Sequence, residues 1–270
     1  LNTSNSESMS NAPEDILTEG IGLAWGSGAA SGAGHVGVLK AIAEPDIQIA
    51  YVAGTSIGAV VGAFYASAMP IYRIDYFALD LNWPDVSGIT LPKLGLFSNH
   101  GLGEFLDRQL GDVQFRDSEK PLAVLATNIT DGTKVILNEG DVSSAVKASA
   151  CVPVLYEPVE IDGQLLVDGG LMESIHLSAL KKMGASRTIG VDLKSERQYQ
   201  RPRNILDILN NSFEIALKHL ANVNVTDIDV LIQPKLGEFS RTDTTNSEKM
   251  IRRGYEAAAH SIQEAKLLNK

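Results

Sequence analysis

Short apolar runs that end in small-residue turns recur along this chain, and a stretch of helical character follows each of them. The run Ile21–Trp25 stops at a glycine, the run 49–53 leads into Gly54, and the run 164–167 leads into Asp168. A short, continuously apolar run of this kind is typical of a strand buried on both faces of a parallel sheet. Because strands and helices alternate, the pattern predicts an α/β fold with a mostly parallel central sheet flanked by helices on both faces.

The same reasoning assigns the rest of the chain. The segment 57–68 (IGAVVGAFYASA) is small and apolar nearly all round, which indicates a helix buried on most of its faces. The other predicted helices are 34–44, 141–151, 177–183, 205–221 and 248–268, and further strands are predicted at 122–128, 134–137, 187–193 and 229–233.

The 270 residues are enough for one large α/β domain. Residues 1–19 are polar and rich in Ser and Asn, so we predict a disordered tail before a single domain at 20–270. Within it, residues 69–101 carry three prolines and show weak periodicity. This stretch is a candidate lid or acyl-chain contact surface, or alternatively an irregular segment packed on the core. Its apolar candidates are Trp83, Leu91, Leu94, Leu96 and Phe97.

Charge and composition exclude several classes of function. The net charge of -10 argues against nucleic acid as the main partner, and it gives no bulk attraction to an anionic membrane. No apolar run reaches the roughly 18 residues of a transmembrane helix. We therefore expect a cytoplasmic protein whose contact with membranes or micelles is transient, local and apolar.

Cys151 is the single cysteine, which excludes an intramolecular disulfide. The five His are scattered, without the spacing of a zinc site, and no acidic calcium loop is visible. We therefore expect no metal and no cofactor. Cys151 ends an apolar helical stretch, so we interpret it as a small core residue rather than as a nucleophile.

The sequence Gly54-Thr55-Ser56-Ile57-Gly58 lies between a predicted strand and a predicted helix, which is the setting of a nucleophile elbow. Such a turn strains the serine backbone and needs glycine on both sides of it. The hydroxyl then projects over the sheet edge with a helix N-terminus behind it, which favours developing negative charge. The alternative is a small-residue turn in which Ser56 caps the helix.

The loop at 26–37 (GSGAASGAGHVG) follows the first predicted strand and consists of small residues. Loops of this type expose backbone N–H groups that suit an oxyanion or a phosphate. Gly32, Gly34 and Gly37 also match a dinucleotide-binding fingerprint. That fingerprint requires an acidic residue at the end of the second strand, where this chain has Thr55 and Ser56, and its glycines come six residues late.

Asp168-Gly169-Gly170 follows a predicted strand. The aspartate could orient or deprotonate a nucleophile, and the alternative is an ordinary turn aspartate before glycine. The three motifs each come at the carboxyl end of a predicted strand. Ligand sites in parallel sheets lie at such ends, so we expect the motifs to meet there.

In this order, the glycine-rich loop, the G-x-S-x-G elbow and the Asp-Gly-Gly motif resemble those of the patatin-like phospholipases, bacterial members included. The resemblance also covers the GHVGVLK stretch after the loop, and it runs from about residue 21 to 193. The closing segment DVLIQPKLGEFS is similar as well. The fold that the resemblance implies is a three-layer α/β/α sandwich.

The resemblance implies a Ser–Asp dyad, with Ser56 as nucleophile and Asp168 as its base. It implies an acyl-enzyme at Ser56 and an oxyanion hole formed by backbone N–H groups of Gly28, Ala29 and Ala30. The supporting positions of the elbow and of the aspartate motif are Gly54, Gly58, Gly169 and Gly170.

Four further residues qualify this interpretation. His176 follows Asp168 in the order of a Ser-Asp-His triad, but we interpret it as a surface or helix-start histidine. His35 is interpreted as a packing and hydrogen-bonding residue.

Where the family usually has Arg this chain has Ser31, and where it often has Gly this chain has Ala29. An Arg there can bind a phosphate bidentately and Ser cannot, so we expect Ser31 to weaken hydrolysis of phosphorylated lipids more than that of simple esters.

Three functions are consistent with these residues. The first is a serine acyl hydrolase: a lipid esterase, phospholipase A or lysophospholipase that acts on a lipid or ester substrate. The second is an inactive or weakened patatin-like protein that binds lipid. The third is a nucleotide-binding oxidoreductase, which would bind nicotinamide and be indifferent to loss of the Ser56 hydroxyl.

Overall fold

The computed structural model describes residues 20–80, 88–89, 94–194, 201–205, 207–209, 211–213, 215, 227–239 and 245–265. The expected tail at 1–19, most of the helix expected at 205–221, and the candidate lid residues Trp83 and Leu91 lie outside the described residues. Across the part of the chain that is described, no helix is both long enough and apolar enough to cross a membrane.

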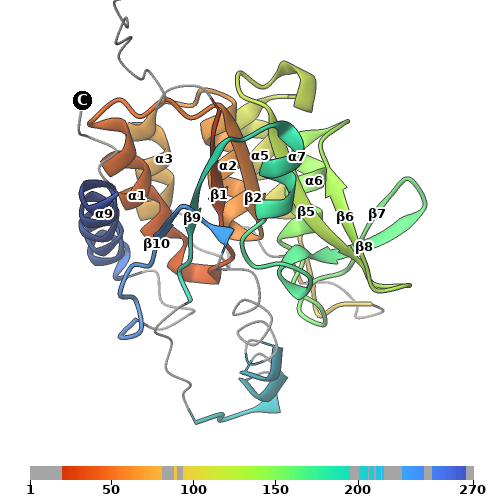
Figure 1. Cartoon of the computed structure of the whole chain (residues 1–270). Helices are drawn as coiled ribbons and strands as arrows, with labels where there is room; N and C mark the ends of the chain where they lie inside the picture. The colour runs from red at the N-terminus through yellow and green to blue at the C-terminus, as the bar shows by residue number, and fades with distance from the viewer. Residues whose placement is uncertain are drawn as a thin grey trace, which may run out of the picture.

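A central sheet of eight strands organises the described residues (Figure 1). Its order is β10-β9-β1-β2-β5-β8-β7, and β6 pairs with residues 124–128 of β5. The strands are β1 Ile21–Trp25, β2 Tyr51–Thr55, β5 Leu122–Asn128, β6 Thr133–Leu137, β7 Val159–Ile161, β8 Gln164–Asp168, β9 Arg187–Val191 and β10 Val230–Ile232. Neighbours from β10 to β5 run parallel, whereas β6, β7 and β8 are added antiparallel, so the expected mostly parallel sheet is confirmed.

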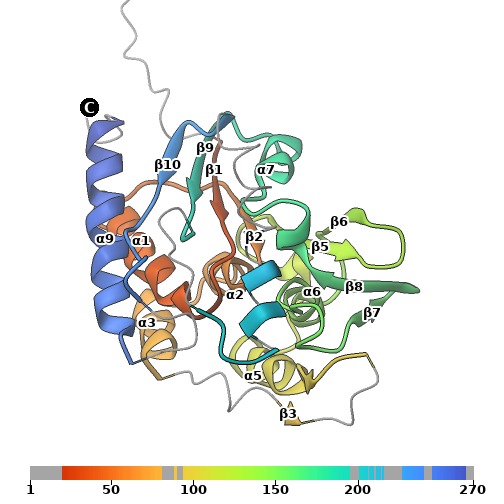
Figure 2. The ribbon, with the colours of Figure 1, turned by 90° about the horizontal axis from the view of Figure 1, so that it is seen from below.

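Helices cover both faces of this sheet, as expected (Figure 2). They are α1 Ala33–Ala43, α2 Ile57–Ala66, α3 Ile71–Asp80, α5 His100–Leu110, α6 Val142–Ser149, α7 Leu177–Met183 and α9 Ser247–Glu264. Short 3-10 turns are η1 Ala29–Gly32, η2 Phe115–Asp117 and η3 Gly169–Leu171, and a small hairpin joins β3 Gly88–Ile89 to β4 Phe97–Ser98.

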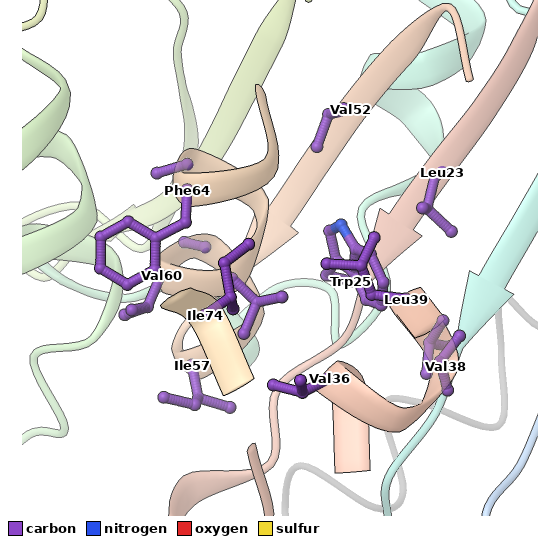
Figure 3. Packing of buried hydrophobic residues seen from close by; sticks show 14 of the residues in the cluster. Leu23, Trp25, Val36, Val38, Leu39, Val52, Ile57, Val60, Phe64 and Ile74 are labelled. Atoms are coloured by element: carbon purple, nitrogen blue, oxygen red, sulfur yellow. The ribbon is translucent and has the colours of Figure 1, made fainter. Parts of the chain in front are cut away.

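The two faces differ in the size of the side chains that they bury. Leu23, Trp25 and Val52 belong to the larger apolar cluster, which extends into α1, α2 and α9. The intervening Ala24 and Ala53 belong to a second cluster with α7. Because successive strand residues point to opposite faces, small residues on one side let α7 lie close to the sheet, while large ones fill the space under α1 and α2 (Figure 3).

Two elements differ from the sequence expectation. The second strand begins and ends two residues later than predicted, because Gly54 and Thr55 continue the pairing of β2 with β1 and β5. The stretch 69–101 contains a regular helix, α3, which packs against α1 and α2. Its exposed Tyr72, Tyr76 and Leu79 obscure the amphipathic pattern. The lid stays a prediction. Leu94 is exposed, as a residue of a lid would be. The N–H groups of Leu96 and Phe97 instead donate to the carbonyls of residues 154 and 155, which attaches the backbone of this part to another segment.

Helix α9 lies alongside α1 in both views of the ribbon (Figures 1 and 2). A Cβ at Gly37 would overlap the carbonyl oxygen of Ile251, and a Cβ at Gly254 would overlap that of Gly34. Glycine at these positions therefore allows the two helix backbones to approach closely. Gly34 and Gly37, the second and third glycines of the apparent dinucleotide fingerprint, thus serve helix packing.

Candidate active site

Ser56 occupies a strained turn between β2 and α2. Its backbone dihedrals are φ 57° and ψ −126°, a conformation that residues other than glycine rarely adopt. Its side chain makes no capping hydrogen bond to α2, so the alternative interpretation of Ser56 as an ordinary helix cap is wrong. The geometry is that of the predicted nucleophile elbow.

The glycines on either side of Ser56 are required by close backbone contacts. A Cβ at Gly54 would lie 2.5 Å from the Cα of Ala59. A Cβ at Gly58 would lie 2.6 Å from the carbonyl oxygen of Gly26 and would also overlap that of Trp25. Because the atoms in the way belong to the backbone, no side-chain rotation would make room for a larger residue.

The hydroxyl of Ser56 donates a hydrogen bond to the carboxylate of Asp168, with 2.7 Å between Oγ and Oδ2. Both residues are buried, with exposed fractions of 6% and 2%. The other carboxylate oxygen, Oδ1, accepts the N–H of Gly170 at 2.8 Å, and Thr127 Oγ1 donates to the Asp168 carbonyl at 3.0 Å. The contacts of Oδ1 and of the carbonyl hold the aspartate in place and leave Oδ2 for the serine.

Asp168 lies at the end of an antiparallel strand, β8, and not at the end of a parallel strand as the sequence suggested. In the register, Thr55 pairs with Leu125 and Asp168 pairs with Ala126, the next residue of β5. Strand β8 therefore runs inward from beyond the carboxyl end of β5 and stops level with the elbow. The expectation that all three motifs follow parallel strands is wrong for Asp168, although the motifs do meet.

Burial raises the pKa of Asp168 above the ordinary aspartate value, because water no longer solvates its charge. The hydrogen bond from Ser56, the positive charge of Lys194 and the N–H of Gly170 act in the opposite direction. Lys194 is itself buried, three residues after the end of β9. Lys194 was not predicted as a site residue from the sequence, although a lysine so close to the end of a buried strand is unusual enough to be a signal.

A turn at the end of α6 contacts both partners through their backbones. The Ser56 N–H donates to Ser149 Oγ at 2.8 Å, and the Asp168 N–H donates to the carbonyl of Cys151 at 2.8 Å. Ser149 is fully buried. The sequence offered only a serine within an apolar helix, and nothing in that pattern distinguishes it from a packing residue.

The glycine-rich loop lies against the first residue of α2. A Cβ at Gly28 would contact Leu193 at 2.7 Å and Ile57 at 3.4 Å, and a Cβ at Gly32 would overlap Ile57. Ala29 has φ 49°, a left-handed conformation that glycine adopts more readily. Ser31 is buried and its N–H donates to the Gly28 carbonyl at 3.1 Å. The structure thus places the loop beside the elbow, where the sequence analysis expected the oxyanion hole.

Neither histidine of interest joins Ser56 and Asp168. His35 is buried, and its Nε2 lies 2.7 Å from the carbonyl oxygen of Gly26. Its ring packs edge-on against Trp25 with 5.2 Å between centroids, as the packing interpretation predicts. Burial lowers the pKa of His35 to about 4.

His176 does begin a helix, α7, but it is completely buried, so the expectation of a surface position is wrong. Its Nδ1 lies 3.2 Å from Glu173 Oε2. Burial alone would raise the pKa of Glu173, but contacts with His176 and Lys134 outweigh it and lower that pKa to about 2. The buried pair of Glu173 and His176 stabilises the segment after Asp168. The carboxylate oxygens of Asp168 are bonded to Ser56 and Gly170 and not to His176, so the three residues do not form a Ser-Asp-His triad.

Cys151 is buried, and its Sγ donates to the carbonyl of Glu157 at 3.0 Å. Burial, together with the nearby charges of Asp168 and Glu157, raises the pKa of its thiol to about 12. The neutral thiol is a poor nucleophile, in line with the interpretation of Cys151 as a core residue. Within the described ranges, no three His, Cys, Asp or Glu side chains gather as metal ligands would.

The chain is similar to several known proteins. It is 28% identical over 256 residues to lysophospholipase NTE1 of Candida glabrata, covering 92% of this chain and 14% of that protein. It is 32% identical over 186 residues to neuropathy target esterase sws of Drosophila melanogaster, covering 65% of this chain and 13% of that protein. The chain thus spans only about one seventh of the length of these relatives.

Among solved structures, the fold is similar to that of VipD from Legionella pneumophila, with a TM-score of 0.54 at 15% identity. That match covers 92% of this chain and 67% of VipD. Residues 23–180 match the family described as patatin-like phospholipase. They include the glycine-rich loop, the elbow at Ser56 and the Asp168 motif, and the chain therefore belongs to the patatin-like phospholipase family.

Proposed function

We propose that this chain is a serine acyl hydrolase that cleaves lipid esters through Ser56 and Asp168. The observation that carries the proposal is the 2.7 Å hydrogen bond from Ser56 Oγ to Asp168 Oδ2 in a strained strand-to-helix turn. A buried serine hydroxyl that donates to a buried carboxylate is poised to lose its proton to that carboxylate. The printed names of the relatives, a lysophospholipase and an esterase, support a lipid ester as the substrate.

The reaction then proceeds in two halves. Ser56 Oγ attacks the ester carbonyl carbon while Asp168 accepts the serine proton, and the carbonyl oxygen becomes an oxyanion. Collapse of this intermediate breaks the ester bond, and the departing alcohol takes the proton from Asp168. A water molecule then attacks the acyl-enzyme while Asp168 accepts one of its protons, and Ser56 Oγ takes that proton back from Asp168 as the acid leaves.

Backbone N–H groups at Gly28, Ala29 and Ala30 would receive the oxyanion. The proposal is supported by the position of this loop against Ile57 and by the left-handed backbone at Ala29. The N-terminus of α2 directly behind Ser56 adds a favourable partial positive charge. Loss of a single oxyanion donor costs about a hundredfold to a thousandfold in rate, so the loop is as important as the dyad.

The raised pKa of Asp168 suits its role as a base. A carboxylate of ordinary pKa is a weak base at neutral pH, and burial brings its proton affinity closer to that of the serine that it must deprotonate. The hydrogen bond from Ser56, the charge of Lys194 and the N–H of Gly170 limit this effect, because each favours the charged carboxylate. The site needs no metal or cofactor for these steps.

A fluorophosphonate probe tests the proposal directly, because it attaches covalently only to an activated serine. We expect wild-type protein to be labelled and to hydrolyse a lysophospholipid and a simple ester. Ser56→Ala should lose labelling and hydrolysis, and Asp168→Asn should lose most of both. Ser261→Ala on α9, which removes a hydroxyl bonded to the Leu231 carbonyl, is the control.

A lipid-binding protein without turnover is the second candidate, favoured by Ser31 in place of the family's arginine. Absence of labelling in folded wild-type protein, together with vesicle or lipid binding, would establish it and refute the hydrolase. Ser31→Arg tests the expected substrate preference: it should raise hydrolysis of a phosphorylated lipid relative to that of a simple ester, and an unchanged ratio would contradict the expectation. Because Ser31 is buried within the loop, a longer arginine side chain needs a new path to solvent, so thermal stability must be measured beside activity.

We infer further that α3 touches the lipid surface from which substrate is drawn. Its Tyr72, Tyr76 and Leu79 have exposed fractions of 73%, 59% and 45%, and their spacing places them on one side of the helix. Tyrosine rings suit the boundary between water and lipid. Tyr72→Asp with Tyr76→Asp should reduce binding to phosphatidylcholine vesicles, whereas Arg252→Asp, an equal charge change on α9, should not.

We also propose that residues 20–270 form one domain, because the last described helix, α9, packs against the first, α1. Limited proteolysis should leave both helices in one resistant fragment, and separate resistant halves would contradict it.

A further inference from the structure

An apolar cleft opens between α1, α2, α3 and α5, with an empty volume of about 530 Å³ that includes its open mouth. Ser247 is the single side chain with a polar atom among the described lining residues, and none of them is charged. The cleft therefore suits an uncharged, apolar guest and excludes a phosphate or a charged headgroup.

One end of this cleft lies beside the candidate active site. Ala29, from the expected oxyanion loop, and Ile57, the residue directly after the nucleophile, both line it. The loop and Ile57 are in direct contact, because a Cβ at Gly32 would overlap the Ile57 side chain. An ester whose carbonyl carbon faces Ser56 would thus have the entrance of the cleft beside its acyl portion.

The cleft follows one face of α2. Ile57, Val60 and Phe64 line it, and their spacing of three and four residues places them one above another along the helix (Figure 3). At a rise of 1.5 Å per residue, the distance from Ile57 to Phe64 is about 10 Å. The cleft therefore extends for about this length along α2, as an extended hydrocarbon chain would.

Three aromatic rings form the far end. Phe105 lies edge-on to Phe64 and to Phe77, with ring centroids 6.1 and 5.3 Å apart, and Phe64 and Phe77 are 5.7 Å apart. All three line the cleft. Mutually packed rings resist displacement more than single side chains do, so this aromatic cluster sets the depth available to a guest.

We propose that this cleft binds the acyl chain of the substrate, with the ester carbonyl at Ala29 and the chain end against Phe64, Phe77 and Phe105. The inference rests on the proposed hydrolase function and deepens it, since it names the substrate as an ester of a medium-length, uncharged acyl chain. Each methylene buried in such a cleft strengthens binding by about fourfold, until the aromatic cluster stops the chain.

A change of chain-length preference tests the proposal. Rates are measured on p-nitrophenyl acetate, butyrate, octanoate and palmitate. Wild-type protein should prefer octanoate. Ala78→Phe, which fills the cleft from α3, should lower the octanoate-to-acetate ratio about tenfold or more, since two or three methylenes lose their place. Phe77→Ala, which removes part of the aromatic cluster, should move the preference towards palmitate.

Ala259→Phe is the matched control, because it adds the same ring to a half-buried alanine on α9 that does not line the cleft. It should leave the chain-length ratio unchanged. Unfolding temperatures of all variants show whether each protein is folded. If Ala78→Phe and Phe77→Ala fold and keep the wild-type ratios, the acyl chain binds elsewhere and the proposal is wrong.

Binding of a fluorescent fatty acid to Ser56→Ala protein separates this proposal from the proposed function. If no ester is hydrolysed and no probe attaches to wild-type protein, the hydrolase is refuted, but the cleft is still tested by this binding. Binding that Ala78→Phe weakens, and Ala259→Phe does not, supports the cleft in that case too. Equal binding to all three proteins overturns it.

Discussion

Ser149→Ala is the substitution that best tests how the elbow is held in place. It removes one oxygen atom, the acceptor that lies 2.8 Å from the Ser56 backbone nitrogen. The N–H of Ser56 then stays buried without this partner, which costs about 1–3 kcal/mol. The same N–H belongs to a residue at φ 57°, a strained conformation that itself costs about 1–3 kcal/mol and needs support from its surroundings.

The loss should therefore appear both in stability and in rate. A cost of about 2 kcal/mol lowers the unfolding temperature by about 4–8 °C in a domain of this size. If the hydroxyl of Ser56 shifts by about 1 Å, attack on the ester slows by as much as about a hundredfold. Because the substrate pocket is untouched, we expect the fall in kcat with little change in KM.

The assay combines thermal unfolding with the rate at which a fluorophosphonate attaches to Ser56. Ser143→Ala is the control, since Ser143 is also buried on α6 but lies about 9 Å further from the elbow along the helix axis. A Ser149→Ala protein that keeps the wild-type rate of attachment to within about twofold would refute this reasoning, whatever its stability.

Three further predictions follow from buried ionisable groups. Asp168→Asn should lose most of the activity yet raise the unfolding temperature at neutral pH, because the folded protein holds an aspartate whose pKa is raised by burial. The gain should shrink as the pH falls through that raised pKa, and an equal gain at acidic pH would contradict the assignment. Glu173→Gln should lower the free energy of unfolding by about 3 kcal/mol at pH 7. The folded pKa of Glu173 is about 2, so this difference in free energy from wild type should disappear as the pH falls from about 4.5 to 2. Denaturant titrations at each pH measure it. Cys151, with a thiol pKa of about 12, should resist iodoacetamide at pH 8 in the folded protein and react readily once unfolded, as mass spectrometry would show; rapid alkylation of folded protein would place the thiol at the surface.

The parts of the site that sequence analysis could predict are those specified by neighbouring residues. The elbow needs Gly54 and Gly58 next to Ser56, and these positions are adjacent in the chain, so the motif is visible without knowledge of the fold. The strands β1 and β5 were predicted with their observed bounds because they are buried along their whole length. Local chemistry is sufficient for such elements.

The residues that could not be predicted act across long separations. Ser149 supports Ser56 from 93 positions away, and its role depends on where α6 ends in space. The contact of Asp168 with Ser56 spans 112 positions and depends on the antiparallel register of β8, which no local pattern encodes, so only the resemblance to a known family predicted it. The glycines of α1 show the reverse case, because a spacing that suits a dinucleotide loop serves the close approach of two helices.

The pairing of α1 with α9 also bears on how the protein is made. On the ribosome, Gly37 is synthesised roughly 200 residues before Gly254, an interval of about 10–40 s at ordinary elongation rates. Throughout that interval the groove beside Gly34 and Gly37 has no partner, and the glycine-rich loop that leads into α1 lacks its outer support. A nascent chain should therefore carry both Ser56 and Asp168 long before it can hydrolyse an ester, and activity should emerge only when α9 docks against α1.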